Sequence, residues 1–240
     1  MSRYALLSLL ALICLGLVNQ DDQKPAPTPT NQIVAAFDGA GWQELFADDS
    51  LDGWRHNCTE ETWALKEGVL SCSGDINGGL MSEKVYENFE VAFEWMHERH
   101  AGNAGFFVWV PDLPEKGLPT GIEVQILDLG YAENWERERG SKPDWFTCHG
   151  DVFPCGTSQM KPFAPSAPNG SRSFPTQELT RPFGEWNHYY IRCINGEVRL
   201  WVNGHEVSGG TACTPAKGPI AFEAESAPIK YRNIWIRELP

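Results

Sequence analysis

Alternation of apolar and polar residues restricts the fold of this chain more than any other feature. Phe89, Val91, Phe93 and Trp95 occupy every second position of one segment, which is the period of a β-strand with one buried face. Similar short segments follow at 62–66, 69–72, 80–82, 104–110, 122–127, 187–194, 197–202, 219–225 and 229–238. No stretch combines the length, period and caps of a helix. The expected fold class is therefore all-β, as a sandwich.

Two of the expected connections are hairpin turns by their chemistry. Asn195-Gly196 and Asn203-Gly204 each separate two strand-like segments. Asn and Gly tolerate the positive φ that two-residue hairpin turns require. We therefore expect the segments 187–194, 197–202 and the chain after Gly204 to pair as neighbouring antiparallel strands.

The N-terminal residues are typical of an exported protein. Residues 1–20 carry Arg3 followed by an uncharged apolar run, as in a signal peptide. Residues 21–34 are rich in Pro and Thr and predict an extended linker, so that the folded domain is expected over 35–240. An exported protein would be periplasmic or extracellular, and an uncleaved N-terminal membrane anchor stays open as an alternative.

The net charge of the chain bears on the classes of partner that it can bind. The chain has 19 basic and 32 acidic residues and a formal net charge of −13. Such an excess of acid argues against nucleic acid and anionic membranes as partners. It does not indicate an oligomeric state.

Six cysteines lie in the expected domain. An even number in an oxidising compartment favours disulfides. Proximity in the sequence suggests the pairs Cys58 with Cys72, Cys148 with Cys155, and Cys193 with Cys213. A zinc site formed by Cys148, His149 and Cys155 is the rival interpretation, although its spacing matches no common zinc motif.

One long segment lacks a regular period. Residues 129–183 are rich in Pro, Gly, Ser and aromatic residues. Segments of this length in a compact domain are usually functional or disordered. The aromatic residues need burial, so we expect an ordered loop over the face that carries Glu123.

The strand 123–128 places polar side chains at its first, third and sixth positions. Glu123 and Gln125 share one face of a regular strand, whereas Asp128 points to the other. The spacing resembles the catalytic strand of the family 16 glycosidases, in which two glutamates flank an aspartate. Gln125 and Asp128 depart from that pattern, and Asp128 is the least secure of the three as a functional residue.

An ordered series of short motifs resembles the 3-keto-disaccharide hydrolase family. The series is Gly41–Phe46, Leu51–Trp54, Asn103–Phe107, Gly121–Asp128, Gly184–Asn187, Val202–Gly204 and Tyr231–Ile234. The resemblance covers residues 38–240. It implies a concanavalin A-like jelly-roll sandwich of two curved antiparallel sheets, with the long ordered loop over the concave face. It also implies an exported hydrolase or lyase that cleaves 3-keto glycosides or disaccharides.

Cleavage beside a ketone needs a base, a group that stabilises an enolate, and a proton donor. Glu123 is the expected base. His149 and Asp151 in the long segment are the further catalytic candidates, because an imidazole can exchange protons and a carboxylate can orient it. The expected substrate-binding residues are Gln125, Asn103, Trp109, Trp145 and Glu225, with burial as the open alternative for Trp109.

No cofactor is certain from the sequence. A divalent cation that stabilises the enolate is the one candidate, with Glu123, His149 and Asp151 as its ligands. Two alternatives to the keto-glycoside reaction stay open. One is a conventional glucanase-like glycosidase, and the other is a carbohydrate-binding module without catalytic activity.

Overall fold

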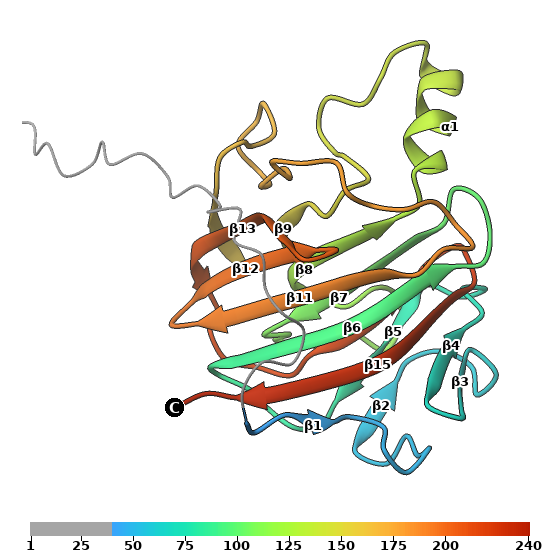
Figure 1. The fold of residues 1–240 in the computed structure, drawn as a ribbon, viewed down its shortest axis with the longest axis vertical. Coiled ribbons are helices and arrows are strands. Elements are labelled where there is room, and N and C mark those ends of the chain that lie inside the picture. Colours follow the sequence, from blue (N-terminus) through green and yellow to red (C-terminus); the bar gives the residue numbers. More distant parts are fainter. Residues whose placement is uncertain (1–39) are drawn as a thin grey trace, which may run out of the picture.

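The computed structural model describes residues 40–240 and consists almost wholly of β-strands (Figure 1). The predicted signal peptide, linker and first residues of the domain lie outside the described residues. Within residues 40–240, no helix has the length and apolar character needed to cross a membrane.

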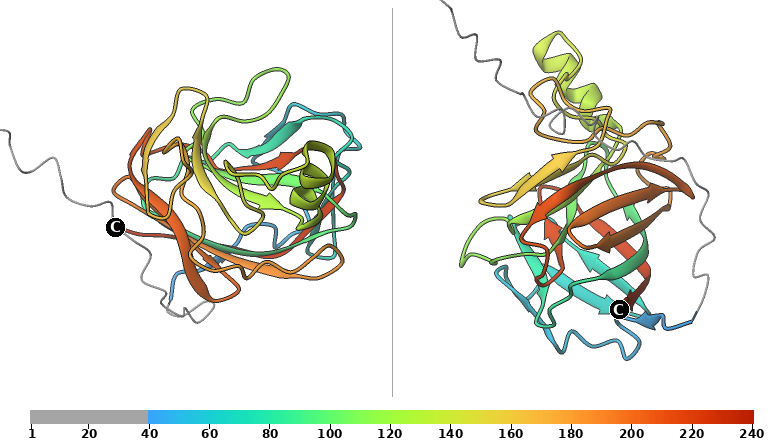
Figure 2. Two further views of the ribbon diagram at one scale, coloured as in Figure 1. Left: turned by 90° about the horizontal axis from the view of Figure 1, so that it is seen from above. Right: turned by 90° about the vertical axis from the view of Figure 1, so that its left-hand side faces the viewer.

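The strands form two antiparallel sheets, as predicted (Figures 1 and 2). The larger sheet has the order β10 (Gln159–Pro162), β13 (His205–Thr214), β12 (Glu197–Val202), β11 (Asn187–Ile194), β6 (Phe89–His97), β15 (Ile229–Glu238), β4 (Val69–Cys72) and β3 (Trp63–Lys66), with β1 (Gln43–Glu44) also paired to β15. The smaller sheet has the order β2 (Trp54–His56), β5 (Gly78–Ser82), β14 (Ala221–Ala224), β7 (Asn103–Val108), β8 (Gly121–Leu127) and β9 (Val152–Cys155).

Aromatic side chains from both sheets fill the space between them. The ring of Phe93 on β6 lies 5.0 Å from that of Phe106 on β7 and 5.8 Å from that of Phe222 on β14. Tyr189 on β11 and Tyr231 on β15 contact Phe93 at 5.9 and 6.0 Å. Because this core takes every second residue of each strand, the intervening side chains of β7, β8 and β14 face outward.

Both predicted hairpin turns are confirmed. Asn195 and Asn203 have φ of 50° and 49°, and the glycines that follow them have φ of 74° and 92°. The turns join β11 to β12 and β12 to β13, and both strand pairs are antiparallel.

The structure also contains elements that the sequence did not predict. Helix α1 (Gly130–Arg139) ends at Gly140, whose φ is 74° and whose N–H donates to the carbonyl of Glu136 at 2.8 Å. The helix is polar around most of its surface, so its sequence lacks the apolar stripe by which amphipathic helices are recognised. Strands β9 and β10 in the long segment were missed as well.

The long segment 129–183 is built onto one end of the sandwich (Figures 1 and 2). Phe146 and Cys148 pack with Leu127 of β8, and Tyr131 and Trp135 of α1 cover them. This packing places α1 and the loops that follow it beside the outward face of β8.

The predicted disulfides are wrong for this structure, in which all six cysteines among residues 40–240 are free. Cys148 is buried beside α1, whereas the thiol of Cys155 contacts Glu123 on the outward face of the smaller sheet. Cys193 and Cys213 lie on β11 and β13, which are separated by β12. Cys72 is near enough to Cys58, and Cys193 to Cys213, for the thiols to interact electrostatically, but neither pair is bonded.

Candidate functional site

A cavity of about 180 Å³ lies on the outward face of the smaller sheet. The sheet supplies acid and amide side chains to it, and the long segment supplies mainly aromatic ones. The lining residues are Asn103, Leu118, Glu123, Gln125, Leu127, Tyr131, Trp145, Phe146, Phe153, Arg172, Glu223 and Glu225. The cavity thus joins three carboxyl groups with amides and aromatic rings, which are the groups that proteins use to bind and transform sugars.

The strand register brings the three carboxyl groups together. On β8, Glu123 and Gln125 alternate with Val124 and Ile126 of the core, so their side chains face outward. Strand β7 lies between β8 and β14, and its residue Gly105 therefore lies between the outward-facing residues of these two strands.

Because Gly105 has no side chain, the carboxyl groups of Glu123 and Glu223 can occupy the space above it. A Cβ atom at residue 105 would lie 2.8 Å from Oε1 of Glu123 and 3.0 Å from Oε2 of Glu223. Both carboxyl groups therefore approach one point above the sheet, and only a glycine permits this without displacing them.

Burial makes these carboxyl groups hold their protons more tightly. It raises the pKa of Glu123 to about 8, although the Cys155 thiol and the Arg172 charge act in the opposite direction. Burial also raises the pKa of Glu223 well above its usual range, and the neighbouring Glu123 and Glu225 add to the effect. The pKa of Glu225 is raised by burial as well. The three groups are therefore not all ionised at neutral pH.

Amide side chains link two of the strands. Gln125 donates through Nε2 to Oδ1 of Asn103 at 3.0 Å, and Asn103 donates through Nδ2 to Oε2 of Glu225 at 2.7 Å. The two predicted substrate-binding residues Asn103 and Gln125 thus lie together in the cavity. Gln125 therefore orients Asn103.

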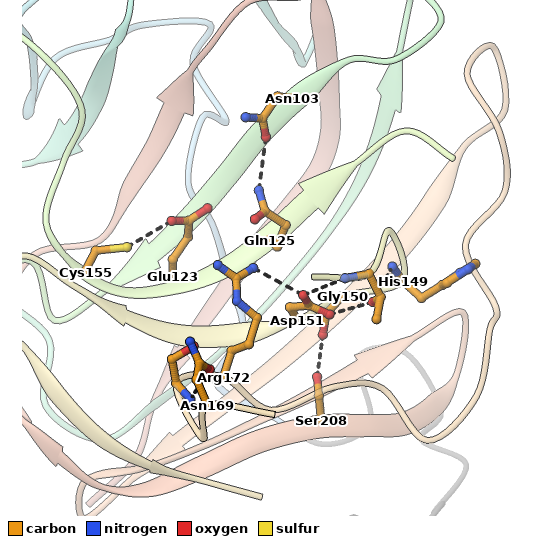
Figure 3. Close-up of polar contacts among 12 residues, drawn as sticks. Asn103, Glu123, Gln125, His149, Gly150, Asp151, Cys155, Asn169, Arg172 and Ser208 are labelled. Carbon is orange, nitrogen blue, oxygen red and sulfur yellow. Dashed lines mark hydrogen bonds and ion pairs between the residues drawn. The ribbon is translucent and has the colours of Figure 1, made fainter. Parts of the chain in front are cut away.

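Arg172 brings a positive charge from the long segment. Its guanidinium carbon lies 3.8 Å from the centre of the Phe153 ring and 4.9 Å from that of the Trp145 ring. Its Nη1 contacts Oδ2 of Asp151 at 3.3 Å. Figure 3 shows the guanidinium group between Asp151 and Glu123.

Asp151 lies behind Arg172 and does not line the cavity. Its carboxylate accepts hydrogen bonds from the backbone N–H and the hydroxyl of Thr147 at 2.9 and 2.5 Å. Burial raises the pKa of Asp151 to about 6, against the effect of the Thr147 hydrogen bonds and the Arg172 charge. The geometry makes Asp151 a partner of Arg172.

His149 does not line the cavity that contains Glu123. The expected catalytic group of Glu123, His149 and Asp151 is therefore corrected. Gly150 between His149 and Asp151 has φ of 102°, and the two side chains diverge from it (Figure 3). The His149 ring lines a neighbouring pocket of about 410 Å³ together with Glu178, and its Nε2 lies 3.9 Å from Oε2 of Glu178.

The two predicted sugar-binding tryptophans have different locations. Trp145 is 42 % exposed and lines the cavity. Trp109 is fully buried, packs against Phe89 at 6.3 Å and donates through Nε1 to the carbonyl of Glu87. The expectation of a sugar contact at Trp109 is therefore corrected, because the Trp109 side chain is part of the core.

Asp128 holds three parts of the backbone together. Its Oδ2 accepts hydrogen bonds from the N–H groups of Ala101 and Gly130 at 2.6 and 3.0 Å, and its Oδ1 accepts one from Phe183 at 2.7 Å. These bonds secure the start of α1 and the end of the long segment. The lower rank given to Asp128 as a functional residue agrees with this position.

The candidate metal ligands Glu123, His149 and Asp151 do not converge on one point. No group of three or more His, Cys, Asp or Glu side chains among residues 40–240 is arranged to hold a metal ion. The donor set proposed for a divalent cation therefore does not fit this arrangement.

Sequence reasoning did not place Arg172 in the cavity or Cys155 beside Glu123, and it included Glu225 but not Glu223 among the binding residues. Arg172 lies in a segment without periodicity, and Cys155 was assigned to a disulfide. Glu223 alternates with core residues Phe222 and Ala224 as Glu225 does, and that alternation was the available signal.

Comparison with known proteins agrees with the resemblance in the sequence. The model of the 3-keto-alpha-glucoside-1,2-lyase-like domain matches residues 41–237. A search of curated proteins found no match.

Three solved structures have a similar fold. Two are candidate glycosyl hydrolases from Parabacteroides distasonis ATCC 8503. The first is 23 % identical, with a TM-score of 0.63 over 83 % of this chain and 95 % of its own. The second is 21 % identical, with a TM-score of 0.60, and the match covers 83 % of this chain and 100 % of that one. The carbohydrate-binding module CBM66 from Bacillus subtilis is 13 % identical, with a TM-score of 0.53, and the match covers 78 % of this chain and 96 % of that one. At these identities, the similarity establishes the fold.

Proposed function

The chain belongs to the family of 3-keto-alpha-glucoside-1,2-lyase-like domains, and we propose that it is an enzyme that cleaves 3-keto glycosides or disaccharides. The proposed reaction removes the proton at C2, eliminates the aglycone from C1 and then adds water. The observation that carries the proposal is the group of buried carboxyls around Gly105, because this reaction needs both a base and an acid beside the sugar ring.

A ketone at C3 makes the C2 proton acidic. When a base takes this proton, the electrons of the C2–H bond form an enolate with its charge on the C3 oxygen. Collapse of the enolate restores the ketone, forms a C1–C2 double bond and breaks the bond from C1 to the glycosidic oxygen, which takes a proton. Water then adds at C1, and a proton returns to C2.

Glu123 has the properties of the base. Its carboxyl group lines the cavity, and its side chain is held by β8 and by the Cys155 thiol, which donates to Oε2 at 3.2 Å. With a pKa raised to about 8 by burial, the ionised Glu123 binds a proton more strongly than an ordinary carboxylate. A raised pKa also leaves part of the enzyme in the inactive, protonated form at neutral pH.

Glu223 has the properties of the proton donor. Its pKa is raised by burial and by the other two carboxyls, so Glu223 keeps its proton at neutral pH. Its buried Oε2 has no hydrogen-bond partner among the described residues. A departing glycosidic oxygen in the cavity would provide that partner and receive the proton.

The remaining lining residues are suited to bind the sugar. Asn103, Gln125 and Glu225 present amide and carboxyl groups to hydroxyls, and Trp145 offers a partly exposed ring for stacking. The protein would act in the periplasm or outside the cell, and the composition of residues 1–20 supports this location.

A pair of substrates tests the proposal. The protein is incubated with a 3-keto glycoside and with the same glycoside before oxidation, and release of the aglycone is measured. We expect turnover of the keto form alone. Turnover of both forms would indicate a conventional glycosidase, which also uses two carboxyl groups. Binding without turnover would indicate a carbohydrate-binding module.

A further inference from the structure

We propose that Arg172 binds the C3 carbonyl oxygen of the substrate and stabilises the enolate that forms there. This inference rests on the proposed function and assigns the one part of that chemistry to which no residue has yet been matched. It also identifies Asp151 as the residue that positions Arg172.

The charge balance of the cavity calls for such a group. Three carboxyl groups line it, and when Glu123 takes the C2 proton its negative charge passes to the enolate oxygen, which then needs a positive partner. Among the described residues that line the cavity, Arg172 is the one basic side chain. Its charge acts on Glu123, whose pKa it lowers against the effect of burial. A cation in a site with little water stabilises an oxyanion strongly.

Arg172 is held in place before any substrate binds. Its guanidinium lies over the Phe153 ring and beside the Trp145 ring, at 3.8 and 4.9 Å. Asp151 fixes Nη1 from behind and is itself fixed by two hydrogen bonds from Thr147. A donor that is already oriented needs no rearrangement when charge develops on the substrate.

The guanidinium also keeps a donor unused. The side chain is 9 % exposed, and its buried Nε has no hydrogen-bond partner among residues 40–240. A guanidinium carries five N–H donors in a planar fork. Because a buried donor without an acceptor is costly, an acceptor that reaches this group would be bound favourably. A carbonyl oxygen accepts without donating, which matches this need.

Three variants test the role of Arg172 in the reaction. Arg172→Gln should lower kcat for a 3-keto glycoside by about 10²- to 10³-fold, which is the usual effect of removing one oxyanion donor. Arg172→Ala should lose a similar factor and regain part of it when guanidinium chloride is added at concentrations that leave the fold intact. Arg199→Gln is the control, because Arg199 is also mostly buried, paired with acids at 2.6 Å and placed 4.8 Å from a ring, on β12.

Arg199→Gln should lose stability and keep kcat. The inference is overturned if Arg172→Gln keeps its kcat, or if Arg199→Gln loses kcat to the same extent. Failure of guanidinium to restore any rate to folded Arg172→Ala would also contradict it.

A binding measurement separates this inference from the proposed function. In a Glu123→Gln background, which cannot remove the C2 proton, we expect tighter binding of the 3-keto glycoside than of its unoxidised form. Adding Arg172→Gln should abolish that preference. If the preference is lost while the parent protein never cleaves the substrate, the proposed function fails and the role of Arg172 stands. A preference that survives Arg172→Gln overturns the role of Arg172 alone.

Discussion

Oε1 of Glu123 and Oε2 of Glu223 lie 2.8 and 3.0 Å from the point that a Cβ atom at residue 105 would occupy, although the two residues are on different strands. The strand between them carries glycine at that position. This relationship gives the site two neighbouring carboxyl groups whose charges interact, and one can act as base while the other acts as acid.

Glu123→Gln should lower kcat for a 3-keto glycoside by at least about 10²-fold, because the amide cannot take the C2 proton. The substitution keeps the shape of the side chain, so the circular dichroism spectrum should not change. Rates are measured by release of the aglycone. An active Glu123→Gln protein would remove Glu123 from the mechanism.

The pH dependence of kcat/KM should show a rise towards alkaline pH. Glu123 must be ionised to act, and its pKa is raised by burial to about 8. The Cys155 thiol donates to Glu123 and thereby lowers the pKa of Glu123, and Cys155→Ala removes this thiol. The rise should therefore move to higher pH in Cys155→Ala and stay in place in the control Cys58→Ala. A shift to lower pH would show that the thiol does not stabilise the ionised form.

The contribution of Glu123 to stability should fall as the pH rises from the ordinary pKa of this group to its folded pKa. The folded pKa of Glu123 is about 8 and its ordinary value is 4.5, so folding favours the protonated form. The contribution to stability is complete below the unfolded pKa and is lost as pH rises through the folded pKa. The glutamine in the Glu123→Gln variant cannot ionise, so this variant does not lose stability in this way.

The difference in Tm between Glu123→Gln and the parent protein should consequently grow between about pH 5 and pH 9. Thermal unfolding followed by tryptophan fluorescence measures it. A difference that is constant over this range would mean that Glu123 has an ordinary pKa in the folded protein.

His149→Gln should leave kcat and KM unchanged, because the His149 ring lines a different pocket, beside Glu178. The same kinetic assay checks this expectation against Asp151→Asn, which should impair catalysis through Arg172. A loss of activity in His149→Gln equal to that in Asp151→Asn would restore the original pairing of the two residues.

Asp128→Ala should lower the free energy of unfolding by about 2 to 4 kcal/mol, because three backbone N–H groups lose a charged acceptor. Urea denaturation measures the change. Asp144→Ala, at an exposed position of the same long segment, is the control and should have little effect. Equal stabilities of the two variants would refute the structural role of Asp128.

The sequence predicted the sheets better than the site. Glu123, Gln125 and Glu225 could be placed on one face because a strand alternates its side chains, and the core residues Val124 and Ile126 fix which face is outward. Arg172 and Cys155 could not be placed, because their positions depend on how the long segment folds onto β8. His149 and Asp151 are two residues apart, and the positive φ of Gly150 separates them in a way that strand spacing does not anticipate.

Deuterium incorporation tests elimination most directly. The enzyme cleaves a 3-keto glycoside in D₂O, and the product is examined by NMR for deuterium at C2, with the substrate alone in the same buffer as the control for spontaneous exchange. Removal of the C2 proton followed by hydration predicts enzyme-dependent deuterium at C2 in every product molecule. A product that keeps its original proton at C2, together with no primary isotope effect for a substrate deuterated at C2, would show direct hydrolysis and would contradict the proposed mechanism.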